Sequence, residues 1–153
     1  MRVLVDTGVW SLALRRTDGH LHLETEELRR LVMAHVAEII GPVRQEILSG
    51  VRYRPQFARL ETHLDAFPDV PLLSEDFVTA AKFFNLCRSK GIQGSNTDFL
   101  ICAVAGRCDL GIFTTDGDFC YFAKCLPIVL HEFKKTGESA SLRPRRPSSK
   151  QKE

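Results

Sequence analysis

The chain has 153 residues, about the size of one domain, and 44% of them are apolar, which is enough to bury a core. Its formal net charge is +2, but residues 143–153 hold five of the 21 basic and one of the 19 acidic residues, which leaves 16 bases against 18 acids elsewhere. The longest apolar segment, 99–105, is too short to cross a membrane, and Asp6 interrupts the first apolar run too early for a secretory signal. The five cysteines form no C-x-x-C pair, so we expect reduced thiols in the core and a cytoplasmic protein.

Hydrophobic periodicity and turn residues predict the elements of the fold. In chain order they are a strand over 2–5, a helix over 24–36, a strand over 39–40, helices over 42–49, 55–66, 76–89 and 97–107, a strand over 110–114, a helix over 118–123 and a strand over 128–130. Short apolar strands that alternate with helices are typical of an α/β fold, here a three-layer α/β/α sandwich with a mostly parallel central sheet. We expect a folded domain over 1–135 and a basic, disordered tail over 136–153, where Gly, Ser, Pro, Arg and Lys dominate.

Three of these helices carry more detailed expectations. The helix over 24–36 should begin near Thr25 and bury Leu28, Leu31, Val32 and Val36. The helix over 76–89 should turn inward Phe77, Ala80, Ala81, Phe84 and Cys87. The helix over 97–107 follows cap residues at 95–97 and is apolar nearly all round, so it should be central and buried.

Acidic residues lie at the boundaries of several of these elements. They are Asp6 after the first strand, Glu46 on the helix over 42–49, Asp98 in the first turn of the central helix, and Asp116 and Asp118 after the strand over 110–114. Ligands of parallel sheets bind outside the carboxyl ends of the strands, so these acids can converge on one edge. Grouped carboxylates repel one another, and a hard divalent cation such as Mg²⁺ or Mn²⁺ relieves that repulsion.

Four segments resemble the PIN domain, and within it the VapC type of ribonuclease toxin. They are Val-Leu-Val-Asp-Thr-Gly-Val-Trp (3–10), Gly-Pro-Val-Arg-Gln-Glu-Ile-Leu-Ser-Gly (41–50), Thr-Asp-Phe-Leu-Ile-Cys-Ala-Val-Ala (97–105) and Thr-Thr-Asp-Gly-Asp-Phe (114–119). The resemblance covers about residues 1–131. Two departures are Gly8, where the family more often has Ser or Ala, and the basic tail, which the family's pattern does not include.

The resemblance implies a Mg²⁺- or Mn²⁺-dependent endoribonuclease, the toxin of a toxin–antitoxin pair. It implies catalytic roles for Asp6, Glu46, Asp98 and Asp116, and metal-binding roles for Asp6, Asp98, Asp116 and Asp118. It also implies an RNA substrate, a small antitoxin partner, a homodimer or a hetero-oligomer with the antitoxin, and no membrane association. A catalytically weak PIN-type module that binds RNA or protein remains the alternative.

Other readings of single motifs fit less well. Asp6-Thr7-Gly8 is also the active-site triplet of retroviral-type aspartic proteases, but their fold is all-β, whereas 24–36 and 76–89 have helical periodicity. Haloacid-dehalogenase-like phosphatases need a second Asp where Gly8 stands. The pair His20 and His22 is followed by no further metal ligand at useful spacing, so we expect a loop or helix start there.

Several surface features leave two readings open. Trp10 either packs over the first helix or offers a platform for a nucleobase. A cluster of Arg44, Arg52 and Arg54 is either a solvated face or a basic rim for RNA phosphates. Four leucines outside the core periodicity suggest a groove for a partner, namely Leu12, Leu14, Leu21 and Leu23.

Overall fold

The computed structural model describes residues 1–15 and 22–133. In chain order the elements are β1 (Val3–Val5), α1 (Thr7–Leu14), α2 (Leu23–Met33), β2 (Ala37–Glu38), α3 (Gly41–Leu48), α4 (Arg54–Leu64), α5 (Ser74–Ser89), α6 (Asn96–Cys108), β3 (Gly111–Phe113), α7 (Asp118–Phe122) and β4 (Val129–Leu130). The predicted tail over 136–153 lies outside the described residues.

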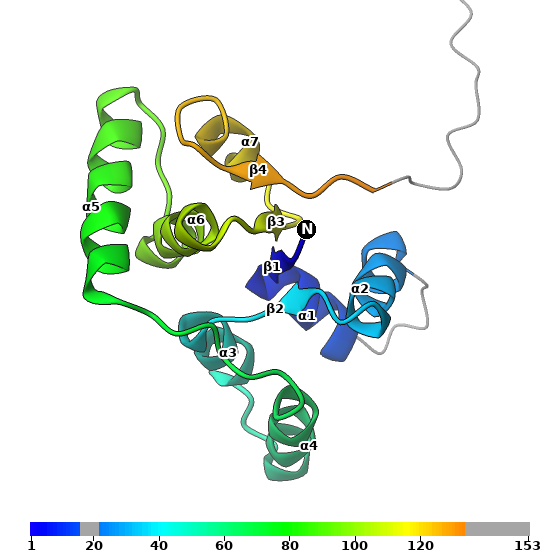
Figure 1. The fold of residues 1–153 in the computed structure, drawn as a ribbon. Coiled ribbons are helices and arrows are strands. Elements are labelled where there is room, and N and C mark those ends of the chain that lie inside the picture. Colours follow the sequence, from blue (N-terminus) through cyan, green and yellow to red (C-terminus); the bar gives the residue numbers. More distant parts are fainter. Residues whose placement is uncertain (16–21, 134–153) are drawn as a thin grey trace, which may run out of the picture.

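The four strands form one parallel sheet in the order β2-β1-β3-β4. In its register Val3 lies opposite Ala37 on one side and opposite Gly111 on the other, and Gly111 lies opposite Val129. Figure 1 shows α5 and α6 on one side of the sheet and α1 and α2 on the other, with α3 and α4 beyond the β2 edge. The α/β sandwich that the sequence predicts is therefore confirmed, and all of its strand pairs are parallel.

Helix α6 is the centre of the core, as its apolar sequence predicts. Its residues 99–105 are all buried, because both the sheet and α5 pack against it. The side chain of Ser95 caps the helix by accepting a hydrogen bond from the Asp98 N–H. The rings of Phe99 and Phe122 pack with their centroids 4.9 Å apart, which joins α6 to α7.

Helix α1 is absent from the elements that the sequence predicts. It begins directly after β1, and the carboxylate of Asp6 caps it by accepting from the Thr7 N–H at 2.7 Å. Trp10 is only 2% exposed, donates its indole N–H to the Val5 carbonyl at 3.2 Å and packs against Phe67. The reading of Trp10 as a nucleobase platform is therefore wrong.

Other local predictions are displaced. The strand expected over 39–40 is β2, two residues earlier. Ile39 forms an isolated parallel bridge with Asp69, and Ile40 is the cap residue before α3. Helix α2 begins after His22, not near Thr25. On α5, Phe77 is 54% exposed and Ala81 is also exposed, so these two predicted core positions are wrong. The buried residue in that turn is Asp76, which hydrophobic periodicity does not predict because its side chain is charged.

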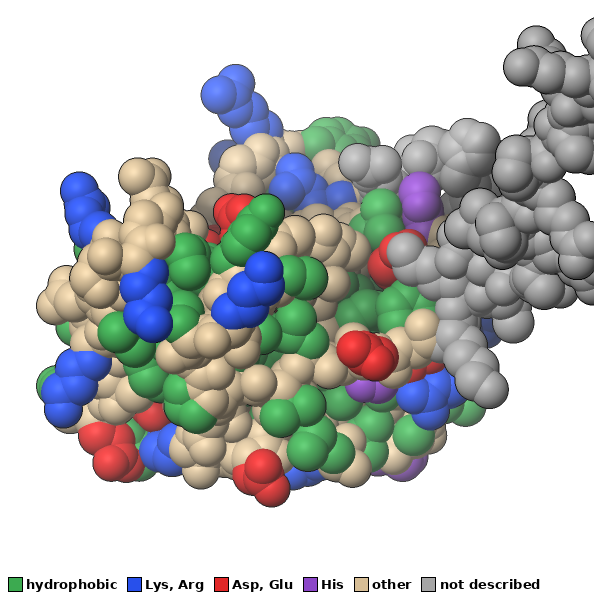
Figure 2. Space-filling view, turned by 90° about the horizontal axis from the view of Figure 1, so that it is seen from above, with side chains coloured by type: hydrophobic (Ala, Val, Ile, Leu, Met, Phe, Trp, Pro, Cys, Tyr) green, Lys and Arg blue, Asp and Glu red, His purple; other side chains and the backbone are tan. Residues whose placement is uncertain are grey.

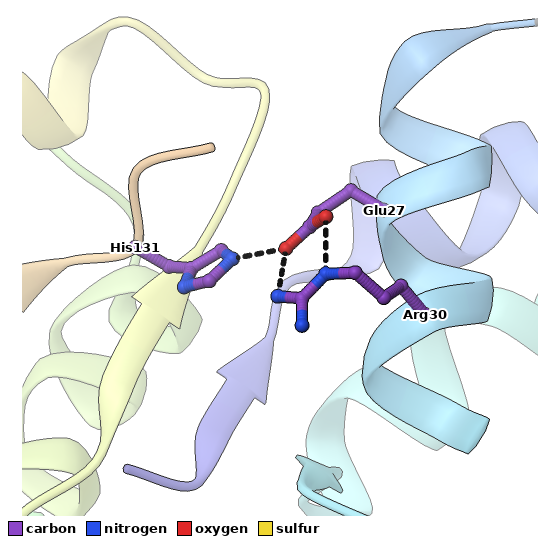
Figure 3. Close-up of polar contacts among 3 residues, drawn as sticks. All are labelled: Glu27, Arg30 and His131. Atoms are coloured by element: carbon purple, nitrogen blue, oxygen red, sulfur yellow. Dashed lines mark hydrogen bonds and ion pairs between the residues drawn. The ribbon is translucent and has the colours of Figure 1, made fainter. Parts of the chain in front are cut away.

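Two ion-pair groups among the described residues involve buried acids and tie distant elements together. Asp76, 1% exposed, accepts from Arg107 Nε at 2.7 Å and Nη2 at 2.9 Å, which joins α5 to the last turn of α6. Figure 3 shows Glu27 of α2 with Arg30 and His131. Glu27 Oε1 lies 2.6 Å from Arg30 Nη2 and 2.7 Å from His131 Nε2, so α2 holds the segment that follows β4. The hydrogen bonds from Arg107 and from Arg30 hold the pKa values of Asp76 and Glu27 below their ordinary range.

Within the described ranges, no helix combines the length and the apolar character that a membrane span requires.

Candidate metal centre

Asp6 and Thr114 meet where β1 and β3 end. One Asp6 oxygen accepts from the Thr7 N–H at 2.7 Å, and the other accepts from the Thr114 hydroxyl at 2.8 Å. The Asp6 N–H donates to the Phe113 carbonyl at 2.9 Å, so the parallel pairing of the two strands sets this position. Asp6 is 8% exposed and is therefore a buried carboxylate with a fixed orientation.

Asp98 lies at the amino end of α6 in a reciprocal capping arrangement. Its Oδ2 accepts from the Ser95 N–H at 2.8 Å, while its own N–H donates to the Ser95 hydroxyl at 3.1 Å. The partial positive charge of a helix amino terminus stabilises an anion at this position. The sequence predicts Ser95 as a cap residue, and its S-x-x-D spacing to Asp98 is the signal of this reciprocal arrangement.

Glu46 projects from α3 and is exposed. Its Oε2 accepts from the Thr7 hydroxyl at 2.6 Å, so the residue after Asp6 also orients the acid of α3. Because α1 packs against α3, this contact brings Glu46 to the side of Asp6. No sequence signal pairs Thr7 with a residue 39 positions away.

Asp116 lies in the turn between β3 and α7, Asp118 is the first residue of α7, and both are exposed. The Asp116 N–H donates to the Thr114 hydroxyl at 3.0 Å, and the Asp118 N–H donates to Asp116 Oδ1 at 2.9 Å. The Thr114 hydroxyl thus connects the Asp6 carboxylate to the backbone that carries Asp116. Threonine hydroxyls thus connect the acids of three segments, namely Asp6, Glu46 and the turn of Asp116, whereas the hydrogen bonds of Asp98 stay within its own helix cap.

The electrostatics of the site disfavour charge on its two more buried acids. Burial, as the largest cause, raises the pKa of Asp6, and the charges of Asp98 and Glu46 raise it further. Burial also raises the pKa of Asp98, to which Asp116 and Glu46 add. Among the described residues, no Lys or Arg forms an ion pair with any of these acids. The site therefore has negative charge that its described surroundings do not neutralise.

A hard divalent cation fits this donor set. All of the side-chain donors are oxygens, and their mutual repulsion is what a cation relieves. In the part of the chain that the structure describes, no group of three or more His, Cys, Asp or Glu side chains forms a ready-made metal cage. Mg²⁺ keeps several waters and needs only one or two carboxylates, so Asp6 and Asp98 are the residues that could hold it.

Of the three arginines in the predicted basic rim for RNA phosphates, one is held by hydrogen bonds within the protein. Arg44 donates from Nε to Asp69 Oδ1 at 3.0 Å, from Nη1 to the Leu64 carbonyl at 2.9 Å, and also to the Phe67 carbonyl. These bonds fix α4 and the segment after it against α3, so Arg44 has a structural role. Arg52 and Arg54 are exposed and stay candidates for contact with phosphates.

A cleft of about 690 Å³ opens near the acids, and two chain neighbours of site residues line it, Gly8 next to Thr7 and Thr115 next to Asp116. It is lined by α1, α2 and α4 and reaches the turn after β3 through Gly8 and Thr115. Leu12, Arg15 and Gln56 also line it. Of the four leucines in the predicted groove, Leu12 thus faces the cleft and Leu14 packs against the core. Leu23 is half-buried and Leu21 lies outside the described residues.

Comparisons with known proteins agree with the sequence resemblance. The family model described as the PIN domain matches residues 3–124. A similar solved structure is VapBC2 from Rickettsia felis bound to a DNA fragment from its promoter, with 17% identity, a TM-score of 0.66, and coverage of 88% of this chain and 100% of that chain. FitAcB from Neisseria gonorrhoeae has 16% identity, a TM-score of 0.67, and coverage of 85% and 96%. FitAB bound to an IR36 DNA fragment has 19% identity, a TM-score of 0.68, and coverage of 84% and 93%.

At these identities the structural likeness shows the fold alone. Comparison with curated protein sequences gave no match. The family model, however, spans most of the chain, from β1 through α7. The chain therefore belongs to the PIN-domain family.

Proposed function

We propose that the protein is a Mg²⁺- or Mn²⁺-dependent endoribonuclease and the toxin of a toxin–antitoxin pair. The observation that supports this most is the group of carboxylates at the end of the sheet, two of them with raised pKa values. Membership of the PIN family, whose members are typically nucleases, supports the same reaction class. The reaction is hydrolysis of an RNA phosphodiester bond.

The position of each residue in the site suggests a different role. Asp6 and Asp98, which are held by hydrogen bonds, would bind the cation. A bound Mg²⁺ or Mn²⁺ would supply Lewis acidity that makes water more acidic and offsets the charge of a phosphodiester. Glu46, exposed and oriented by Thr7, would accept a proton from the attacking water. Asp116, in the turn after β3, and Asp118, at the start of α7, would offer further oxygen ligands or orient that water.

A cleavage experiment tests the activity. Asp6→Asn and Asp98→Asn should each abolish cation-dependent cleavage of a structured RNA pool and leave the protein folded, because amide and carboxylate have nearly the same shape. Asp109→Asn is the matched control. Asp109 is the cap residue at the carboxyl end of α6, the helix that carries Asp98, and its φ of 53° is a conformation that Asn also accepts. Full activity in both site variants, or undiminished activity in EDTA, would contradict the metal-dependent mechanism. Absence of cleavage by the unmodified protein across a titration of divalent cations would favour the alternative of a catalytically weak binding module.

We infer that the cleft near the acids receives a segment of the antitoxin. The structural neighbours are VapBC and FitAB complexes, which supports a small protein partner. The cleft offers an apolar contact at Leu12 and charges of both signs at Arg15 and Glu24. Figure 2 shows the side on which α7 and β4 lie, where basic and acidic side chains are scattered and form no single charged patch.

The partner is tested with the product of the adjacent small reading frame. Co-expression should give a stable complex, and Leu12→Arg should weaken it while Leu86→Arg, on the exposed surface of α5, should not. A protein that stays monomeric at micromolar concentration and ignores that product would contradict the assignment. Size-exclusion chromatography with light scattering separates a homodimer from a hetero-oligomer.

A further inference from the structure

Two of the five cysteines lie in direct contact, although both are free thiols. Cys87 Sγ and Cys125 Sγ are 3.4 Å apart. Cys87 lies in the last turn of α5, and Cys125 follows α7, 38 positions along the chain. Because a disulfide has a sulfur–sulfur distance of about 2.0 Å, the two atoms need to approach by roughly 1.4 Å. Small changes in two side-chain torsions supply a movement of that size.

The surroundings of the two thiols are unequal. Cys87 is completely buried, and burial, with the adjacent Cys125, raises its pKa to about 11. Cys125 is only half-buried. A thiol reacts with oxidants as the thiolate and only where the oxidant can reach it. Cys125 is therefore the thiol that an oxidant reaches first, and the buried Cys87 is the second thiol, in contact with it.

We propose that Cys87 and Cys125 are a modification site, a dithiol that closes to a reversible disulfide when it meets a peroxide. The Cys125 thiolate attacks one oxygen of hydrogen peroxide, the O–O bond breaks, and the released hydroxide takes up a proton to leave as water. The Cys87 sulfur then attacks the sulfenic sulfur, the S–O bond breaks, and the second oxygen leaves as water with the Cys87 proton. In total, two thiols and one peroxide give one disulfide and two waters.

The disulfide would join two elements on which acids of the site depend. Helix α7 begins at Asp118 and follows the turn that carries Asp116. Helix α5 packs along α6, whose first turn carries Asp98. A bond between Cys87 and Cys125 therefore ties the Asp116 turn to the α5–α6 pair. A thiol reductant can reverse it, because the half-buried Cys125 sulfur is open to attack. The inference does not rest on RNA cleavage.

The test follows the thiols of the full-length reduced protein. The protein is exposed to a small excess of hydrogen peroxide, unfolded in N-ethylmaleimide and weighed by mass spectrometry. Three of the five cysteines should be alkylated, with a linked peptide pair that contains Cys87 and Cys125, and dithiothreitol should restore all five. The oxidised protein should unfold at a temperature higher by about 5–10 °C, because the bond restricts the unfolded chain.

Variants make the assignment specific. Cys125→Ser changes a half-buried side chain, so it should fold, keep its other four cysteines alkylatable after oxidation and lose the thermal shift. Cys120→Ser is the matched control, since Cys120 is exposed on α7 and has no place in the pair. Its disulfide should form as in the unmodified protein. Five alkylated cysteines after oxidation, a bond that uses Cys120, or sulfinic acid at Cys125 with Cys87 still reduced would each overturn the proposal.

Discussion

The hydroxyl of Thr114 connects two parts of the site, and Thr114→Val removes that connection while it keeps the shape of the side chain. In the native protein the hydroxyl donates to Asp6 Oδ2 at 2.8 Å and accepts from the Asp116 N–H at 3.0 Å. A hydrogen bond to a charged group contributes about 1.5–3 kcal/mol, and one to an exposed N–H contributes about 0.5–1 kcal/mol. The variant should therefore lose roughly 2–4 kcal/mol of stability, which lowers the unfolding temperature by about 4–16 °C in a chain of this size.

The same substitution should change the dependence on pH in a defined direction. The pKa of Asp6 is raised by burial, and the hydrogen bond from Thr114 partly opposes that rise. Without the hydroxyl the pKa of Asp6 should rise further, so the carboxylate becomes available to a cation only at higher pH. If the proposed nuclease activity is correct, the acidic limb of the rate against pH should therefore move to higher pH.

The raised pKa also fixes the sign of the effect on stability. A group whose pKa is higher in the folded than in the unfolded protein stabilises the fold at low pH, and this stabilisation is lost as pH rises through the folded pKa. In the absence of a cation, Asp6 and Asp98 should thus make the protein less stable at neutral than at mildly acidic pH. Added Mg²⁺ should reverse that loss, because a ligand that binds only the folded state stabilises it.

Thermal unfolding in EDTA and in Mg²⁺, with initial cleavage rates across pH, measures both effects. Thr115→Val is the matched control, because Thr115 is the exposed neighbour in the same turn and its substitution leaves both Thr114 bonds in place. If Thr114→Val and Thr115→Val unfold at the same temperature and share one acidic limb, then Thr114 does not couple Asp6 to Asp116. The assignment of Thr114 as the residue that orients Asp6 would then be wrong.

Three other predictions concern stability and the tail. Asp76→Ala should lower the free energy of unfolding by about 3 kcal/mol, because it removes a buried ion pair to Arg107 and a helix cap. Denaturant unfolding of the single variants at Asp76 and at Arg107, and of the double variant, measures the coupling between the two residues. Gly94→Ala should cost about 1–3 kcal/mol, because its Cβ would lie 2.6 Å from a buried phenylalanine ring; Gly117→Ala, with open space around it, is the control in the same unfolding assay. Truncation after Ser141 should lower RNA affinity and flatten its dependence on salt without moving the cut, as binding titrations across salt concentrations can show. An unchanged slope would identify an inert, solubilising tail.

The sequence by itself determined the features that depend on neighbours in the chain. Alternating apolar strands and helices indicated the α/β class, and the wholly apolar 99–105 indicated a central helix. Asp6 and Asp98 were identifiable because each lies at a boundary that local patterns mark, the end of an apolar strand and a capped helix start. Parallel strands bring such boundaries to one edge, so their approach could also be anticipated.

Only the tertiary structure decided what each side chain contacts across the chain. Helix α1 contains Gly8 and the β-branched Val9, so its own propensity is weak, and it forms because Val9 and Trp10 are buried against other elements. Phe77 has the spacing of a core residue, yet the ion pair of Asp76 turns a different face of α5 inward. The bond from Thr114 to Asp6 spans 108 positions, and the contact of Cys87 with Cys125 spans 38. Periodicity reports which face of an element is apolar, but the partner of a polar or sulfur atom is set by how the elements pack.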